Sequence, residues 1–431
     1  MFWFDFHWQI QSILNSVWYP LNMLLIVVAG GIAYLGYRQP VYAVGATIIL
    51  LPTYLFRSSI YFLPFTFLET CIIAMFSGWL LAAIVQKKLR RTEPPYIYRW
   101  PIILLLGGAT IGLVISPTFT NAAGLWKAYF VEPILFLIVF KEVIKNDADK
   151  RTLLWALGIS SLTVSLLAIY QKFTGFAIAE PVWTNEASRR VTAFFTSPNA
   201  VGLYLGPTIA LYSGWLLSEW RNVQATILKS LILVLALLAV LFTVSHGTWL
   251  GLLAAAAVLS YFGWNKKKTV LVTLILIIIT LVVPPLRQQV LPIITFQDHA
   301  GQNRITLLQT SWQYLTAHPS HFLFGAGILG FSELHQQTRE PLLTEPLLYP
   351  HNIIFNFWLE TGLVGLVGII WLLSKFFGRS ISKISTVTAN RFLILGVLTA
   401  MVVILVHGLV DVPYFKNDLA VLFWIMVGLS K

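Results

Sequence analysis

Charged side chains are scarce in this sequence of 431 residues, at 11% of the total, whereas soluble domains carry about a quarter. Hydrophobic residues make up 57% of the chain. A water-soluble fold could not hide this much apolar surface. The shortage of charge therefore excludes an ordinary soluble domain and predicts an integral membrane protein.

Cysteine is almost absent, since Cys71 is the single example. One cysteine excludes both an intramolecular disulfide and a metal site built on cysteine ligands. His318 and His321 have a spacing that metal ligands use, but Pro319 between them disfavours a regular helix, and the sequence has no HExxH motif. We therefore expect no metal and no cofactor.

Long apolar runs, such as residues 227–245, match the length of helix that crosses a hydrocarbon core of about 30 Å. The runs are too uniform for the alternating strands of a barrel, so helices are the way to satisfy the backbone. The predicted fold is an all-α integral membrane protein with about 12–13 transmembrane helices. The candidate spans are residues 21–37, 41–56, 64–85, 102–117, 120–140, 152–171, 199–217, 226–244, 246–263, 269–285, 353–373, 392–410 and 414–430. The N-terminal residues Met1–Asp5 contain no basic region, so no cleaved signal peptide is expected.

The net charge of +12 comes largely from short basic clusters between the apolar runs, such as residues 87–91 and 266–268. This is the positive-inside pattern of membrane insertion rather than a nucleic-acid surface. It places the loops around 86–99, 141–151, 218–225, 265–268 and 375–391 in the cytoplasm. The two longest connections, 172–198 and 286–352, are then extracytoplasmic.

We predict one polytopic domain with three parts. Residues 1–285 form an N-terminal transmembrane bundle, residues 286–352 a long extracytoplasmic loop, and residues 353–431 the C-terminal transmembrane helices. The loop holds five of the eight histidines, and long connections in compact proteins are usually functional or disordered.

The most informative polar residues lie where this loop enters the next span. Pro350, His351 and Asn352 form a plausible helix start, and Asn352, Asn356 and Glu360 share one helical face through their spacing of four. A neutral imidazole can accept a proton, so His351 is a candidate general base. The alternative is a capped helix whose histidine lies at the membrane interface.

Arginines in the extracytoplasmic connections oppose the positive-inside trend. Arg189 and Arg190 precede one span, and Arg304 lies in the loop that leads to His351. The planar guanidinium suits phosphate and pyrophosphate oxygens, which makes all three candidates for binding an anionic leaving group. Contact with lipid headgroups is the alternative.

Further polar residues are supporting candidates. His407 and Asp411 are spaced by four and can pair, for which we favour an orienting role. His246 marks a tight hairpin and could face the same cavity, although a plain turn explains it as well. The GxGxxG spacing of residues 325–330 lacks the βαβ context of a dinucleotide site, so we interpret it as a flexible surface turn.

Together these segments resemble the bacterial O-antigen ligase and O-antigen polymerase family. The resemblance covers roughly residues 120–430 and rests on four blocks of sequence. The blocks are Arg190–Asn199 (RVTAFFTSPN), Ser245–Gly251 (SHGTWLG), Arg304 through Phe331, and Pro350–Gly365 with its His-Asn and Glu-x-Gly elements. The last block is the most specific.

The resemblance implies a C-type membrane glycosyltransferase whose donor is a glycan on undecaprenyl pyrophosphate. It implies that Arg190 and Arg304 hold the pyrophosphate, that His351 is essential, and that no metal is needed. The partners would be the donor, a lipid, glycan or protein acceptor, and membrane lipids, at the extracytoplasmic face of the cytoplasmic membrane, as in lipopolysaccharide biosynthesis. This chain departs from the family at His246, where Arg is frequent.

Two alternatives remain open. One shares the fold and differs only in the acceptor, as a surface-polysaccharide polymerase or a protein O-glycan ligase. The other is a lipid-linked glycan flippase or a transporter, which predicts charged residues along a central path and broken helices near the midplane. The polar residues of this sequence gather on the outer side instead, and this favours chemistry there.

Overall fold

The computed structural model describes residues 18–60, 63–87, 96–178, 180–264, 299–338, 347–386 and 390–430, with a few single positions between 266 and 295. The chain divides into two compact units. Unit 1 comprises Met1–Thr92 and Ile134–Ser160, and unit 2 comprises Glu93–Pro133 and Ser161–Lys431. Every candidate site residue named above falls in unit 2.

Unit 1 is helical apart from one short hairpin. Its elements are α2 (Trp18–Arg38), α3 (Pro40–Ile49), the 3-10 helix η1 (Leu51–Leu55), strands β1 (Arg57–Ile60) and β2 (Leu63–Thr66), α4 (Phe67–Val85), and parts of α7 (Glu132–Val143) and α8 (Asp147–Thr174). A capping box starts α4, because the Thr66 hydroxyl accepts the Glu69 N–H and the Glu69 carboxylate accepts the Thr66 N–H. Glycine lets α2 and α4 cross closely, since a Cβ on Gly78 would lie 2.0 Å from the Ala33 carbonyl oxygen.

The predicted span 41–56 is wrong as a continuous helix. Helix α3 ends at Ile49, and η1 and the hairpin follow it. Pro52 lies in the first turn of η1, where a proline is tolerated, but its ring prevents the preceding helix from running through this point. Strands β1 and β2 then pair antiparallel, with Arg57 opposite Thr66. The predicted span 269–285 lies mostly outside the described residues.

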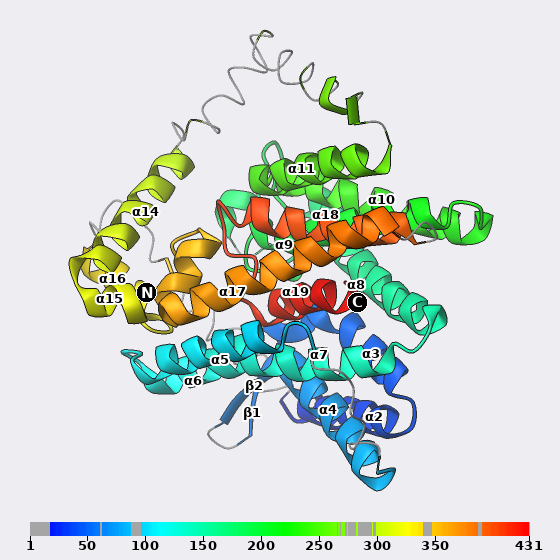
Figure 1. Ribbon diagram of the computed structural model, residues 1–431, viewed down its shortest axis with the longest axis horizontal. Helices are drawn as coiled ribbons and strands as arrows, with labels where there is room; N and C mark the ends of the chain where they lie inside the picture. Colours follow the sequence, from blue (N-terminus) through cyan, green and yellow to red (C-terminus); the bar gives the residue numbers. More distant parts are fainter. Residues whose placement is uncertain are drawn as a thin grey trace. The chain divides into compact units, whose positions relative to one another are not determined.

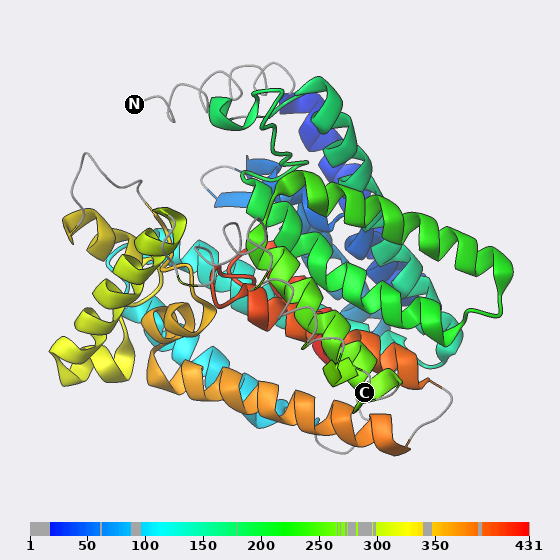
Figure 2. The same cartoon turned by 90° about the horizontal axis from the view of Figure 1, so that it is seen from above.

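Unit 2 contains the remaining helices. They are α5 (Arg99–Val114), α6 (Phe119–Trp126), the π-helix η3 (Lys127–Val131), the 3-10 turn η4 (Pro181–Trp183), α9 (Pro198–Ser218), α10 (Val223–Thr243), α11 (His246–Gly263), α14 (His299–Ala317), α15 (Pro319–Phe324), α16 (Gly330–Thr338), α17 (Ile353–Thr386), α18 (Arg391–His407), α19 (Asn417–Leu429), and the rest of α7 and α8. Helix α9 packs against α10, α11 and α18, and α17 packs along α5 (Figure 1). Figure 2 shows α14, α15 and α16 gathered beside the start of α17.

Six of the described helices are long and apolar enough to cross a membrane, judged by length and composition. They are Phe67–Val85, Phe119–Val143, Asp147–Thr174, Pro198–Ser218, Val223–Thr243 and Ile353–Thr386. Shorter apolar helices of 10–17 residues accompany them. The all-α, multi-pass membrane fold predicted from composition is therefore confirmed.

Small residues set the helix crossings of unit 2. A Cβ on Gly214 of α9 would lie 2.4 Å from the Cα of Gly396 in α18, and one on Gly112 of α5 would lie 1.9 Å from the carbonyl oxygen of Glu360 in α17. Membrane helices gain no hydrophobic energy by leaving lipid, so they associate through such close backbone packing. The crossing at Gly112 fixes the part of α17 that carries Glu360.

Helix α17 is broken at Gly362, which has φ 63° and ψ −174°. The loop after α15 packs on this break, since the N–H groups of Ala326 and Gly327 donate to the Leu359 carbonyl at 2.7 and 3.1 Å. The turn predicted within residues 325–330 is present, but its predicted surface location is wrong. The loop is tied to α17, and Ile328 within it is fully buried.

Candidate active site

His351 lies directly before α17 and faces the segment between α18 and α19. Its Nδ1 is 3.3 Å from Oδ1 of Asp411, which also accepts the backbone N–H of Val412 at 2.9 Å. His351 is 29% exposed, whereas Asp411 is 6% exposed. A buried carboxylate that accepts Nδ1–H leaves Nε2 of the imidazole with the lone pair, and the side chain remains accessible to a substrate.

The backbone around His351 is held against the same segment. Asn352 caps α17 by accepting the N–H groups of Ile354 and Phe355, at 3.0 and 3.2 Å, which confirms the predicted helix start. Its amide nitrogen donates to the Leu409 carbonyl at 3.1 Å. His351 itself has φ 50°, a left-handed conformation that a non-glycine residue adopts at an energetic cost. The surroundings fix the imidazole in place.

The electrostatics of Asp411 favour the ionised carboxylate. Burial raises the pKa of Asp411, but the hydrogen bond from His351 and the charges of His351 and His407 lower it, so that the pKa lies below its usual value. Lys416 lies close enough for its charge to interact with Asp411 and Asp418, although burial lowers the pKa of Lys416 overall. The Asp411 carboxylate is thus a buried anion in contact with the half-buried imidazole of His351.

Arg190 is anchored at the end of α10. Its Nε donates to the Thr243 carbonyl at 2.8 Å, and Nη2 lies 3.3 Å from the Val244 carbonyl and 3.4 Å from Oδ1 of Asn199. Partial burial lowers the pKa of Arg190 from its usual value. A guanidinium stays charged even so, and a cation that has lost water gains from an anionic partner. This position suits an arginine that binds a phosphate group.

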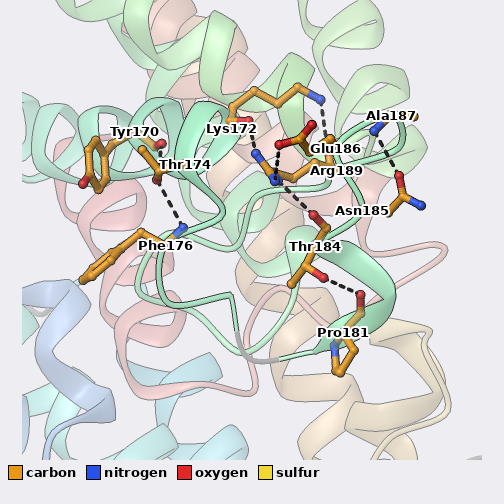
Figure 3. Close-up of polar contacts among 10 residues, drawn as sticks. All are labelled: Tyr170, Lys172, Thr174, Phe176, Pro181, Thr184, Asn185, Glu186, Ala187 and Arg189. Carbon is orange, nitrogen blue, oxygen red and sulfur yellow. Dashed lines mark hydrogen bonds and ion pairs between the residues drawn. The ribbon is translucent and has the colours of Figure 1, made fainter.

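Arg189 points into its own loop (Figure 3). Its Nε donates to the Thr184 carbonyl at 3.1 Å and Nη1 donates to the Lys172 carbonyl at 3.0 Å, while Lys172 Nζ donates back to the Arg189 carbonyl. The weakest of its contacts is 3.9 Å to the exposed carboxylate of Glu186. The two neighbouring arginines therefore differ, and the contacts of Arg189 favour a positioning role.

Contacts through α11 and α18 lead from Arg190 toward His351. Thr243, which binds Arg190, also accepts the Ser245 N–H through its hydroxyl at 3.2 Å. The Thr248 hydroxyl donates to the Ser245 hydroxyl at 3.0 Å and lies 3.4 Å from Nδ1 of His407. Thr243, Ser245 and Thr248 are all buried, so the contacts that lead from Arg190 to His407 form a rigid connection.

Arg304 joins the cluster from α14. Its charge lies near enough to His407 for the two groups to interact, and His407 interacts in the same way with Asp411. The sequence predicted a pair between His407 and Asp411. Their charges do interact, and the carboxylate also contacts the imidazole of His351 at 3.3 Å. The structure thus brings Arg304, His407, Asp411 and His351 together. Arg190 is linked to His407 by the contacts through Thr248 and Ser245.

Other histidines contact neighbouring aromatic rings. His246 is exposed, and its ring packs edge-on against Trp249 at 5.5 Å. The loop histidines are occupied within the loop: His321 stacks on Tyr314 with ring centroids 4.2 Å apart, and His335 stacks on Phe331. These contacts indicate structural roles.

Asn356 and Glu360 lie on the buried face of α17, as their spacing predicted. Both are 0% exposed. A carboxyl group inside a membrane-spanning helix needs a partner or water, and Glu360 lies near the backbone of Leu329 in the docked loop. Both side chains therefore lie buried in the stretch of α17 that precedes the break.

Gln171 of α8 is important to the site and was missed. It is fully buried, and its Oε1 accepts the N–H groups of Thr192 and Ala193 at 3.0 and 2.7 Å, while Nε2 donates to the Ala193 carbonyl at 3.0 Å. Gln171 thus fixes the backbone of the segment that follows Arg190. A glutamine within an otherwise apolar span was the signal in the sequence that could have found it.

These features define a class: a multi-pass, all-α membrane protein with an imidazole–carboxylate pair and arginines from separate segments in one unit. Residues 231–370 match the family model described as O-antigen ligase. The matched segment is about a third of the chain, and over these residues the chain is similar to the O-antigen ligase family. No curated protein matches the chain.

The matched segment contains His246, Arg304, His351, Asn356 and Glu360. Arg190, His407 and Asp411 lie outside it. Their place in the cluster therefore rests on the contacts described above and is independent of the family match.

Proposed function

We propose that the protein is a membrane glycosyltransferase that moves a glycan from undecaprenyl pyrophosphate to an acceptor hydroxyl at the extracytoplasmic face of the cytoplasmic membrane. The observation that carries the proposal is the 3.3 Å contact between His351 and Asp411, with the charge of Arg304 beside the neighbouring His407. A base and a cation in one cluster are what glycosyl transfer with an anionic leaving group needs.

In the proposed reaction, Nε2 of His351 removes the proton of the acceptor hydroxyl. The oxygen forms a bond to the anomeric carbon, and the bond from that carbon to the pyrophosphate oxygen breaks. The electron pair leaves with undecaprenyl pyrophosphate, and Arg190 and Arg304 stabilise its developing charge. Asp411 holds the Nδ1–H and stabilises the imidazolium that forms. A single displacement inverts the anomeric configuration.

Pyrophosphate needs little help to leave, so the mechanism requires no general acid and no metal. Arg189 acts in this scheme by holding the loop from which Arg190 projects. Asn352 and the buried Asn356 and Glu360 position His351 through α17. A polymerase or a protein O-glycan ligase would use the same chemistry on another acceptor.

The experiment measures glycan transfer in membranes that contain the wild-type protein, His351→Ala or Arg304→Ala. We expect a loss of about 10²–10⁴-fold for the histidine variant and about 10²–10³-fold for the arginine variant. Arg221→Ala is the matched control, because Arg221 is exposed and packs on its neighbour Trp220, away from the cluster. Full activity in both site variants, or loss of transfer in EDTA, would contradict the mechanism.

The same assay separates the proposal from a flippase or a transporter. Such a protein would change the leaflet in which the lipid-linked glycan lies without forming a glycosidic bond. A product that joins glycan to acceptor through a new glycosidic linkage supports the transferase.

A further inference from the structure

Two tyrosines contact each other, one of them two residues before the candidate base, and the proposed mechanism does not use them. Tyr129 belongs to the π-helix η3, and Tyr349 precedes His351 by two residues. Their hydroxyl groups are 3.3 Å apart, although the residues are 220 positions apart in the chain. Both side chains are half-buried. π-Helical turns are rare and often occur at functional sites.

Buried aromatic residues hold the two rings in place. Phe415 is 0% exposed, and its ring centroid lies 6.3 Å from that of Tyr129 and 6.0 Å from that of Tyr349. The Tyr414 hydroxyl donates to the Tyr129 carbonyl at 2.9 Å, and Trp424 donates to that hydroxyl. The rings are therefore preorganised, which lowers the entropy cost of binding a ligand.

Polar contacts fix the π-helix to α19. Glu132 is 1% exposed and accepts a hydrogen bond from Asn417 at 3.1 Å, and Lys127 Nζ lies 3.7 Å from its other oxygen. Lys127 is about one-third exposed, so this ion pair lies partly open to solvent. Glu132 thus connects the start of α19 to the helix that carries Tyr129.

The segment between α18 and α19 arranges these groups in order. His407 interacts with Arg304 at one end, Asp411 binds His351 in the middle, and Phe415 supports the tyrosines at the other end. A donor whose pyrophosphate lies by Arg304 and whose anomeric carbon faces His351 leaves the tyrosine end for the second substrate.

We propose that Tyr129 and Tyr349 form a binding platform for the acceptor, and that this acceptor is a carbohydrate. A sugar ring has an apolar C–H face and a rim of hydroxyl groups. A tyrosine offers an aromatic face for the first and a hydroxyl that donates and accepts hydrogen bonds for the second. The inference rests on the proposed function and adds the class of acceptor that binds there. A protein acceptor would present only a side-chain hydroxyl and would not fill this subsite.

The test measures binding of short oligosaccharides released from the surface polysaccharide of cells that carry the protein. The full chain is purified with His351→Ala, so that no transfer occurs, and saturation-transfer NMR detects sugar protons that contact the protein. Adding Tyr349→Ala or Tyr129→Ala is expected to weaken binding about tenfold, which equals about 1.4 kcal/mol for each ring. Tyr170→Ala is the matched control, because Tyr170 is exposed on α8 and contacts Phe176.

Further variants separate folding and the donor site from the platform. Tyr349→Phe keeps the ring and is expected to retain part of the binding, which shows that the loss in Tyr349→Ala is not misfolding. Arg304→Ala is expected to leave oligosaccharide binding unchanged, because Arg304 lies at the other end of the cluster. Equal binding in Tyr349→Ala, Tyr129→Ala and the control would overturn the inference.

Kinetics provide the second measurement. In the otherwise wild-type protein, Tyr349→Ala is expected to raise the acceptor KM about tenfold with little change in kcat, because the lost interaction holds substrate and transition state alike. An unchanged acceptor KM would count against the platform and leave the proposed function intact. Transfer that survives His351→Ala would instead refute the proposed function, whatever the tyrosine variants do.

Discussion

At the scale of single residues, the proposed active site depends on which partner each charged group has. Arg189 and Arg190 are neighbours in sequence, yet the guanidinium of Arg189 is bound to carbonyls of its own loop and of α8, and that of Arg190 to the end of α10. Asp411 contacts the imidazole of His351 at 3.3 Å, and His407 interacts with Asp411 through charge. Residue types and spacing identify such groups, but only the folded chain selects their partners.

Asp411→Asn tests the pair without removing bulk. An amide nitrogen facing Nδ1 favours the imidazole tautomer whose proton is on Nε2. In this tautomer Nε2 cannot remove the proton from the hydroxyl group of the acceptor substrate. We expect kcat for transfer to fall at least 10²-fold while the donor KM changes little. Asn352→Asp is a useful comparison, because it keeps an oxygen at the cap of α17. Normal kcat in Asp411→Asn would contradict the orienting role.

Asp411 also predicts how stability depends on pH. Because its pKa in the folded protein lies below the unfolded value of about 3.9, the carboxylate contributes stability above that pH. This contribution is lost as the pH falls further, through the lowered folded pKa. The difference in Tm between wild type and Asp411→Asn should therefore be largest above about pH 4 and shrink in stronger acid. A Tm difference that grows on acidification would show that the pKa of Asp411 is raised, not lowered, in the folded protein.

At the scale of elements, the break in α17 and the loop that packs on it are the features that position the site. The sequence predicted the helix start at Asn352 and the shared face of Asn356 and Glu360. It did not predict the break at Gly362, because the helical pattern of apolar residues continues through it. The break depends on a loop more than 30 positions away in sequence, so no local pattern could reveal it.

Gly362→Ala is expected to destabilise the protein by about 2 kcal/mol or more, because a side chain is strained at this positive φ. The added Cβ would also lie 2.6 Å from the Leu323 carbonyl oxygen. Gly378→Ala in the same helix is the matched control, since a Cβ there meets nothing within 4 Å. Thermal unfolding of the detergent-solubilised variants measures the difference. Equal Tm values would mean that the break is not needed.

At the scale of the whole molecule, composition alone predicted an all-α membrane protein. A chain with so few charges and such long apolar runs cannot hide its apolar surface from water and must fold in the lipid bilayer. The positions of most spans also followed from hydropathy. The exception at residues 41–56 arose because a helix, a 3-10 turn and a hairpin can have the same composition as one span. The sequence proposed His351 and the arginines as parts of one site, but it assigned Asp411 to His407, since spacing gives no distances between separate segments.

The sidedness of the chain is a prediction at the same scale. In a Cys71→Ser background, a cysteine at Gln313 of α14 should react with an impermeant maleimide in intact cells. A cysteine at Ser385, near the end of α17, should react only after permeabilisation, because basic residues place that loop in the cytoplasm. Both positions are exposed. The reverse labelling pattern would put the site on the wrong side for the proposed donor.

The most direct test of the account is the configuration of the bond that the purified protein forms. A purified undecaprenyl-pyrophosphate glycan and an oligosaccharide acceptor are incubated with the protein, and the new linkage is examined by NMR. The account predicts a glycosidic bond whose anomeric configuration is inverted relative to the donor, formed by the wild type and not by His351→Ala. A retained configuration, or equal product from His351→Ala, would contradict a single displacement assisted by this histidine.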